Sequence, residues 1–137
     1  MCNCLILWAA LLLASLSPLW ASEVAEPKAF SALPPKDAYE MIEKNNADPR
    51  FVLIDIRTPA EFADGHIKGA ININYNDDNF VEQLDRLDKT KTYVIYCRTG
   101  RRSSDALDIM KRLGFKNVYR IAGDITRWKG EGLPTVK

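Results

Sequence analysis

The stretch Cys97-Arg98-Thr99-Gly100-Arg101-Arg102-Ser103 decides the fold, because it joins a short apolar run to a segment with a helical pattern. The run 93–96 predicts a strand, and segment 104–113 predicts an amphipathic helix. A strand, a tight loop and a helix in this order place Cys97 at the mouth of a turn. Backbone N–H groups and the positive end of the helix converge there. With three arginines in the same loop, these groups favour the thiolate, and we interpret Cys97 as a nucleophile.

The spacing Cys-x-x-Gly-x-Arg-Ser resembles the active-site loop of the rhodanese (sulfurtransferase) superfamily. The matching residues are Cys97, Gly100, Arg102 and Ser103. Two further stretches are similar to rhodanese signatures: Asp-Ile-Arg-Thr-Pro-Ala-Glu-Phe at 55–62, which runs on through 65–70, and Ala-Gly-Asp-Ile-Thr-Arg-Trp at 122–128. The resemblance therefore covers nearly everything after residue 35.

Other functions of a reactive cysteine, and other partners, fit this sequence less well. A cysteine-dependent phosphatase would need its arginine at position 103, where this chain has Ser103, and the tighter loop favours sulfane sulfur and small oxyanions. Nineteen Lys and Arg residues against 18 Asp and Glu give no electrostatic case for binding nucleic acid or an anionic membrane surface. Arsenate or phosphate-ester chemistry on the same loop is a third class, which the short loop disfavours.

Apolar runs alternate with helical patterns through residues 35–137. We expect strands at 51–54, 70–73, 93–96 and 118–121. We expect helices from Pro35 to the Asn45-Asn46 pair, from a capping box at Thr58, from caps at 76–78 with Phe80, Leu84 and Leu87 inward, over 104–113, and after a cap at Asp124. This order predicts one α/β domain, a mainly parallel sheet with helices on both faces, and it agrees with the rhodanese-like fold that the resemblance implies. Cys97 then lies at the carboxyl edge of the sheet, where ligands bind.

Some residues near the candidate site are interpreted as structural. Asp55 and Arg57 end a strand, and we favour a framework ion pair over a role in chemistry. His66 is the only histidine. It is a tempting general base, but an anion-stabilising loop can activate a thiol without one, and the resemblance places it in a structural turn. A lone histidine also argues against a metal site, so we expect neither metal nor cofactor. Trp128 is expected in the core.

The amino-terminal segment has the features of an export signal. The unbroken apolar run 5–14 suits a signal peptide better than a membrane-spanning helix. We expect a signal peptide over 1–21 with cleavage after Ala21, a linker over 22–34, the domain over 35–137, and a periplasmic or secreted product. No Lys or Arg precedes the run, so an uncleaved membrane anchor is the alternative. Cys2 and Cys4 lie in this segment, which leaves Cys97 without a partner for an internal disulfide.

The resemblance implies a single-domain sulfurtransferase similar to thiosulfate:cyanide sulfurtransferases. Cys97 would take sulfur from a thiosulfate-like donor as a persulfide and pass it to cyanide or a thiol. The candidate substrate-binding residues are Arg98, Thr99, Gly100, Arg101, Arg102 and Ser103. Arg102 can instead brace the loop, and the Ser103 hydroxyl can cap the helix, serve the persulfide or do both. The second class of function is a non-enzymatic sulfur carrier or binding module.

Overall fold

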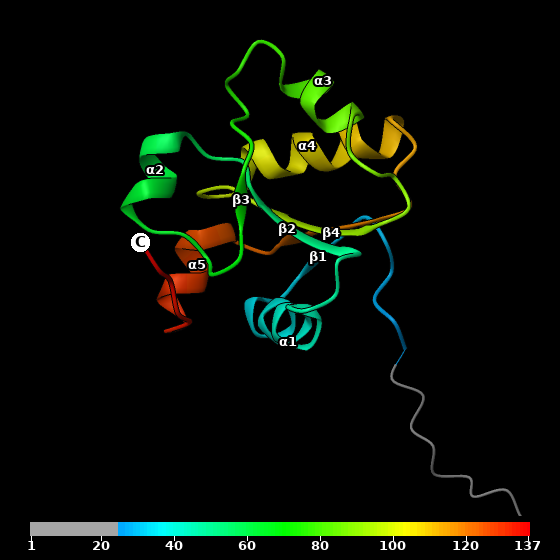
Figure 1. Cartoon of the computed structure of the whole chain (residues 1–137). Helices are drawn as coiled ribbons and strands as arrows, with labels where there is room; N and C mark the ends of the chain where they lie inside the picture. The colour runs from blue at the N-terminus through cyan, green and yellow to red at the C-terminus, as the bar shows by residue number, and fades with distance from the viewer. Residues whose placement is uncertain (1–24) are drawn as a thin grey trace, which may run out of the picture.

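The computed structural model describes residues 25–137, which form one five-stranded parallel sheet with helices on both faces (Figure 1). The strand order is β1-β5-β4-β2-β3, and every neighbouring pair is parallel. The strands are β1 (Ser31–Leu33), β2 (Phe51–Asp55), β3 (Ile71–Asn72), β4 (Thr92–Tyr96) and β5 (Asn117–Ile121). The helices are α1 (Pro35–Asn45), α2 (Pro59–Asp64), α3 (Phe80–Asp85), α4 (Arg101–Arg112) and α5 (Asp124–Gly130). The predicted fold class is confirmed.

Two hydrophobic clusters, one on each face, hold the sheet between its helices. Helices α3 and α4 cover one face and α1 and α5 the other (Figure 1). Successive side chains of a strand point to opposite faces. In β4, Tyr93 and Ile95 accordingly join the cluster under α3 and α4, while Val94 and Tyr96 join the other. Cys97 continues this alternation on the α4 side.

The connections around β4 create a crevice at the carboxyl edge of the sheet. Strand β4 lies between β2 and β5. The chain leaves β2 toward β3 on one side, whereas it leaves β4 toward β5 on the other. The connections therefore diverge between β2 and β4, which is where ligands bind in open α/β sheets. The segments that follow these two strands, 56–61 and 97–103, meet at this point, where Arg102 binds Glu61.

Strand β1 corrects the predicted linker. Residues 31–33 pair with β5 in register, Ser31 with Tyr119 and Leu33 with Ile121, whereas the sequence pattern predicts a linker over 22–34. A strand of three residues is too short to show a period-two pattern, so only its pairing with β5 identifies it. The predicted signal peptide lies outside the described residues. Within 25–137, none of the helices has the length and apolar character needed to cross a bilayer.

The predicted starts of α4 and α3 were wrong, and so was the cap predicted for α5, which is Gly123 rather than Asp124. Helix α4 begins at Arg101 rather than Ser104, with Gly100 as its N-cap, so part of the loop forms the first helical turn. Helix α3 begins at Phe80, with Asn79 rather than 76–78 as its N-cap. The capping box at Thr58 and Glu61 is confirmed, with both reciprocal hydrogen bonds present. Polar side chains in a loop offer several candidate caps, and only the backbone path selects one.

Candidate active site

The sulfur of Cys97 lies at the amino-terminal end of α4. Gly100, the N-cap, donates its backbone N–H to Cys97 Sγ at 3.2 Å. This bond and the partial positive charge of the helix terminus both favour a negatively charged sulfur. The residue is only 1% exposed, yet it borders an open cleft. The site therefore combines a shielded sulfur with a route for a small ligand.

Gly100 is needed at its position for two reasons. Its φ of +125° lies in the region that other residues rarely adopt. A Cβ atom added there would also come within 3.1 Å of Asp124 Oδ2 and 3.5 Å of Arg120 Nη1. Only glycine allows the amide to turn toward the sulfur while the loop stays close to these two side chains.

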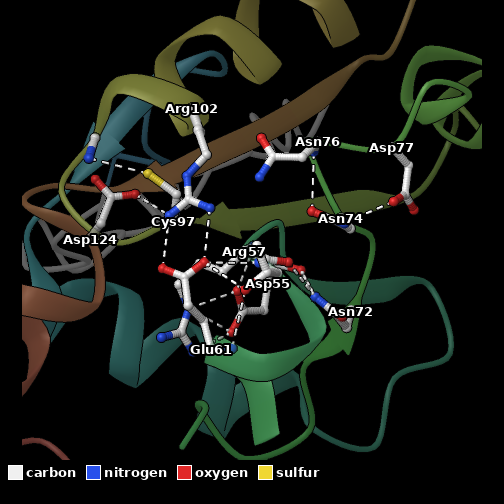
Figure 2. A network of polar contacts seen from close by, with 12 residues as sticks. Asp55, Arg57, Glu61, Asn72, Asn74, Asn76, Asp77, Cys97, Arg102 and Asp124 are labelled. Carbon is white, nitrogen blue, oxygen red and sulfur yellow. Dashed lines mark hydrogen bonds and ion pairs between the residues drawn. The ribbon is translucent and has the colours of Figure 1, made fainter. Parts of the chain in front are cut away.

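Asp124 holds the start of the Cys97 loop and is not the predicted helix cap. Its buried carboxylate accepts a hydrogen bond from the backbone N–H of Cys97 at 2.7 Å (Figure 2). The other carboxylate oxygen lies 3.5 Å from Arg120 Nη1. The N-cap of α5 is Gly123, in a left-handed conformation and with no side-chain cap. The turn at Gly123 thus aims the carboxylate at the loop instead of at its own helix.

The first turn of α5 holds the same loop through its backbone. Ile125 donates its N–H to the Cys97 carbonyl at 3.2 Å, and Thr126 donates its N–H to the Arg98 carbonyl at 3.2 Å. The Thr126 hydroxyl also donates to the Arg98 carbonyl, at 2.8 Å. These amides belong to the orphan donors of a helix terminus. The loop carbonyls accept hydrogen bonds from these amides, and the same bonds fix the main chain of the loop.

Glu61 ties Arg102 of the loop to helix α2. The guanidinium donates two hydrogen bonds of 3.0 Å, one to each carboxylate oxygen (Figure 2). The hydrogen bond from Arg102 is the main reason that the pKa of Glu61 falls from 4.5 to about 2, with further lowering from Thr58. In turn the hydrogen bond to Glu61 raises the pKa of Arg102. Glu61 therefore serves both the capping box and the Cys97 loop.

Asp55 and Arg57 form the framework ion pair that the sequence favoured. Arg57 Nη2 lies 2.7 Å from Asp55 Oδ2, and their side chains are 6% and 0% exposed. Arg57 also donates to the Gly65 carbonyl at 2.7 Å. Neither residue borders the Cys97 cleft. The pair fixes the end of β2 against the turn after α2.

The cleft at Cys97 has a volume of about 320 Å³, at the lower end for small-molecule sites. Its walls are formed by Tyr75, Asn76, Cys97, Thr99, Arg101 and Arg102. A larger hollow of about 450 Å³ lies at the opposite edge of the sheet, near Phe51, Thr92 and Asn117 at the amino ends of three strands. No cysteine lines that hollow in the described part of the chain. The reactive residue Cys97, and not a larger volume, distinguishes the Cys97 cleft from this hollow.

The predicted loop residues occupy different surroundings. Thr99, Arg101 and Arg102 line the Cys97 cleft, whereas Arg98 lines a second cleft with Glu61 and Lys129. Ser103 is completely buried, and its hydroxyl donates to the Gly100 carbonyl at 3.2 Å. The hydroxyl thus braces the loop, and no hydrogen bond caps α4 through it.

His66 takes part in local packing. Its ring stacks on Phe62 with centroids 3.7 Å apart, and Nδ1 lies 2.9 Å from the Phe62 carbonyl. Its backbone pairs with Val136 in an isolated antiparallel bridge, and it does not line the Cys97 cleft. Across 25–137, no group of three or more His, Cys, Asp or Glu residues could hold a metal ion.

Comparison with known proteins places this geometry in a family. The model of the rhodanese-like domain matches residues 34–131, which is most of the chain. The protein belongs to the rhodanese-like domain family. The match agrees with the resemblance of the three sequence stretches. The matched region includes strands β2 to β5, the Cys97 loop and α5, and β1 lies just before it.

Similar proteins support sulfur transfer as the general chemistry. The chain is 39% identical over 92 residues to the putative sulfurtransferase YtwF of Bacillus subtilis, which covers 67% of this chain and 86% of that protein. It is 36% identical over 98 residues to a sulfurtransferase of Allochromatium vinosum, and this alignment covers 71% of this chain and 90% of that protein. The crystal structure of a rhodanese-related protein from Thermoplasma volcanium superimposes with a TM-score of 0.66 at 30% identity, covering 77% of this chain and 97% of that one.

Sequence reasoning missed two supports of this rhodanese-like site. Glu61 was assigned only to a capping box, although the same carboxylate binds Arg102. Asp124 was assigned to a cap, although it binds the Cys97 amide. The partners lie 41 and 27 residues away along the chain, so no local pattern could indicate them. Tyr75 and Asn76 had likewise not been assigned to the cleft.

Proposed function

We propose that the protein is a thiosulfate-type sulfurtransferase that moves sulfane sulfur through a persulfide on Cys97 to cyanide or a thiol. The observation that carries this proposal is the hydrogen bond from the Gly100 amide to Cys97 Sγ, at the amino-terminal end of α4. The amide and the helix terminus stabilise a thiolate before the reaction and a persulfide anion after it. The sulfurtransferases among the relatives support the same chemistry.

The proposed reaction has two displacements on one sulfur atom. In the first, the Cys97 thiolate attacks the outer sulfur of the donor; a new S–S bond forms, the donor's S–S bond breaks, and sulfite leaves with the bonding electron pair. In the second, the acceptor attacks the same outer sulfur, and the Cys97 thiolate leaves with its electron pair. The two steps balance without an oxidant or a reductant, and they predict ping-pong kinetics.

Among the three arginines of the loop, we assign the donor's oxyanion end to Arg101. Arg101 lines the cleft with Cys97, and within the described residues no salt bridge engages it. Arg102 is held by Glu61 and therefore positions the loop, while Arg98 lines the second cleft. A guanidinium is well suited to bind the planar face of a sulfonate-type anion.

The first experiment measures thiocyanate formed from thiosulfate and cyanide, with intact mass after thiosulfate alone. We expect turnover and the gain of one sulfur atom in the wild type, and neither in Cys97→Ser. A persulfide without thiocyanate would favour the sulfur-carrier function over the enzyme. The absence of both in the wild type would overturn the proposal.

A matched pair of variants tests the arginine assignment. Loss of a charge-assisted hydrogen bond predicts that Arg101→Ala raises KM for thiosulfate by roughly tenfold. Arg98→Ala removes the same charge from the same loop but from the other cleft, so its KM is expected to stay within about twofold of the wild type. Equal effects of the two variants would mean that the loop attracts the donor only through its total charge.

We also propose that the protein is exported, because the run 5–14 fits a signal peptide. In the native host, the mature chain should begin at Ser22 and appear in the exported fraction. Amino-terminal sequencing and cell fractionation check this. An intact amino terminus in the membrane fraction would instead favour the membrane-anchored alternative.

A further inference from the structure

Asn76 forms part of the wall that faces the arginines across the Cys97 cleft. It lies on the loop between β3 and α3, and it borders the same cleft as Cys97, Arg101 and Arg102. Its carboxamide extends from this loop on the side of Arg102 (Figure 2). A side chain in this place can contact a ligand that reaches Cys97.

The carboxamide of Asn76 is available for a ligand. The other three asparagines of segment 72–79 use their side chains within the protein: Asn72 binds the carbonyls of Asp55 and Arg57, Asn74 binds Asp77, and Asn79 binds Gln83. Within 25–137, the Asn76 side chain makes no hydrogen bond to another residue. Its main chain, however, is held, because its N–H donates to Asn74 Oδ1 at 3.1 Å. The backbone is thus positioned while the amide group faces the cleft unpaired.

The neighbouring residue makes this wall rigid. The Tyr75 hydroxyl donates to Asp105 Oδ2 at 2.6 Å, and this bond is the main reason that the pKa of Tyr75 is raised. The Tyr75 ring packs against Phe80 with centroids 5.1 Å apart, and its N–H donates to the Ile56 carbonyl at 3.0 Å. A loop fixed at these points loses little conformational freedom when a ligand binds.

From these observations we infer that Asn76 is a specificity-determining residue, whose carboxamide N–H binds the oxyanion end of the sulfur donor. The inference rests on the proposed function and adds a neutral donor to the charged one that Arg101 supplies. The carboxamide N–H orients the bound anion through a hydrogen bond and adds no charge to the cleft. It therefore favours a donor whose leaving group carries anionic oxygen, as sulfite does, over a donor that lacks one.

The test measures how well sulfite protects Cys97 from alkylation by iodoacetamide, an uncharged reagent. Sulfite binding requires no sulfur transfer, and peptide mass spectrometry separates Cys97 from Cys2 and Cys4. In Asn76→Asp, like-charge repulsion is expected to raise the half-protecting sulfite concentration by about tenfold. Asn79→Asp is the matched control: it adds the same charge to the same loop, outside the cleft. There the concentration should change by less than about twofold.

Two further variants separate the hydrogen bond from the charge. Asn76→Ala should raise the half-protecting concentration by about threefold, since one neutral hydrogen bond is lost, and Asn76→Gln should recover part of that loss. The inference is overturned if Asn76→Asp and Asn79→Asp shift protection equally, or if neither does. The inference is also overturned if, without sulfite, Asn76→Asp lowers the rate of Cys97 alkylation by the same factor by which it raises the half-protecting sulfite concentration. The substitution would then have altered the thiol itself. Thiosulfate loading of the wild type, measured in parallel, reports on the proposed function separately.

Discussion

Two of the ion pairs near the Cys97 loop, Asp55–Arg57 and Glu61–Arg102, differ mainly in burial. The Asp55–Arg57 pair has side chains that are 0% and 6% exposed, whereas those of Glu61 and Arg102 are 28% and 19% exposed. Both acidic residues come from one short stretch of chain at the end of β2 and the start of α2. A buried pair is costly to break, while a partly solvated pair contributes little and can be rearranged. The first therefore belongs to the framework, and the second can tune the position of Arg102.

The largest expected effect is on the buried pair. Arg57→Ala would leave the Asp55 carboxylate charged and unpaired in the interior, at a cost of about 3–5 kcal/mol in the free energy of unfolding. Urea unfolding followed by circular dichroism measures this. Arg86→Ala is the control, because it removes an exposed helical pair with Glu82; we expect a change within about 0.5 kcal/mol. A similar small loss for both variants would show that the buried Asp55–Arg57 pair is no costlier to break than the exposed pair of Arg86 and Glu82.

The framework was easier to predict than the site, and the two ion pairs illustrate why. Asp55 and Arg57 are two residues apart, so a strand end with both charges already suggested a pair. Short apolar or alternating runs also predicted four of the five strands, β2 to β5. Glu61 and Arg102 come together only because α2 and the loop after β4 meet at the carboxyl edge of the sheet. Contacts of this kind depend on the tertiary fold, and the short strand β1 depends on pairing with β5 in the same way.

Asp124 extends the comparison to a buried carboxylate that binds a neutral amide, the Cys97 N–H, as well as Arg120. Asp124→Ala would leave the buried Cys97 N–H without its acceptor, which costs about 1–3 kcal/mol. Alanine would also have to adopt the positive φ of 54° found here, a conformation that asparagine tolerates better. Asp124→Asn, which keeps an acceptor, should therefore lose less stability than Asp124→Ala. Equal losses in urea unfolding would assign the effect to the charge beside Arg120 rather than to the amide bond.

The smallest effect is expected for the partly solvated pair. Glu61→Gln keeps a side chain that can complete the capping box but removes the charge that binds Arg102. We expect a loss of about 1 kcal/mol in the free energy of unfolding at neutral pH. Glu82→Gln, which breaks the exposed pair with Arg86, provides the control and should have a smaller effect. A loss as large as that of Arg57→Ala would show that burial does not separate the two pairs.

The pH dependence of this loss identifies its cause. Because folding lowers the pKa of Glu61 from 4.5 to about 2, its ionised form stabilises the folded state, and this contribution is complete at pH values above the unfolded pKa. The contribution is lost as the pH falls through the folded value. The difference between wild type and Glu61→Gln should accordingly be constant from neutral pH to about pH 5.5 and shrink between about pH 4.5 and pH 2. A difference that persists unchanged at pH 3 would mean that packing, and not the charge on Glu61, holds Arg102 beside Cys97.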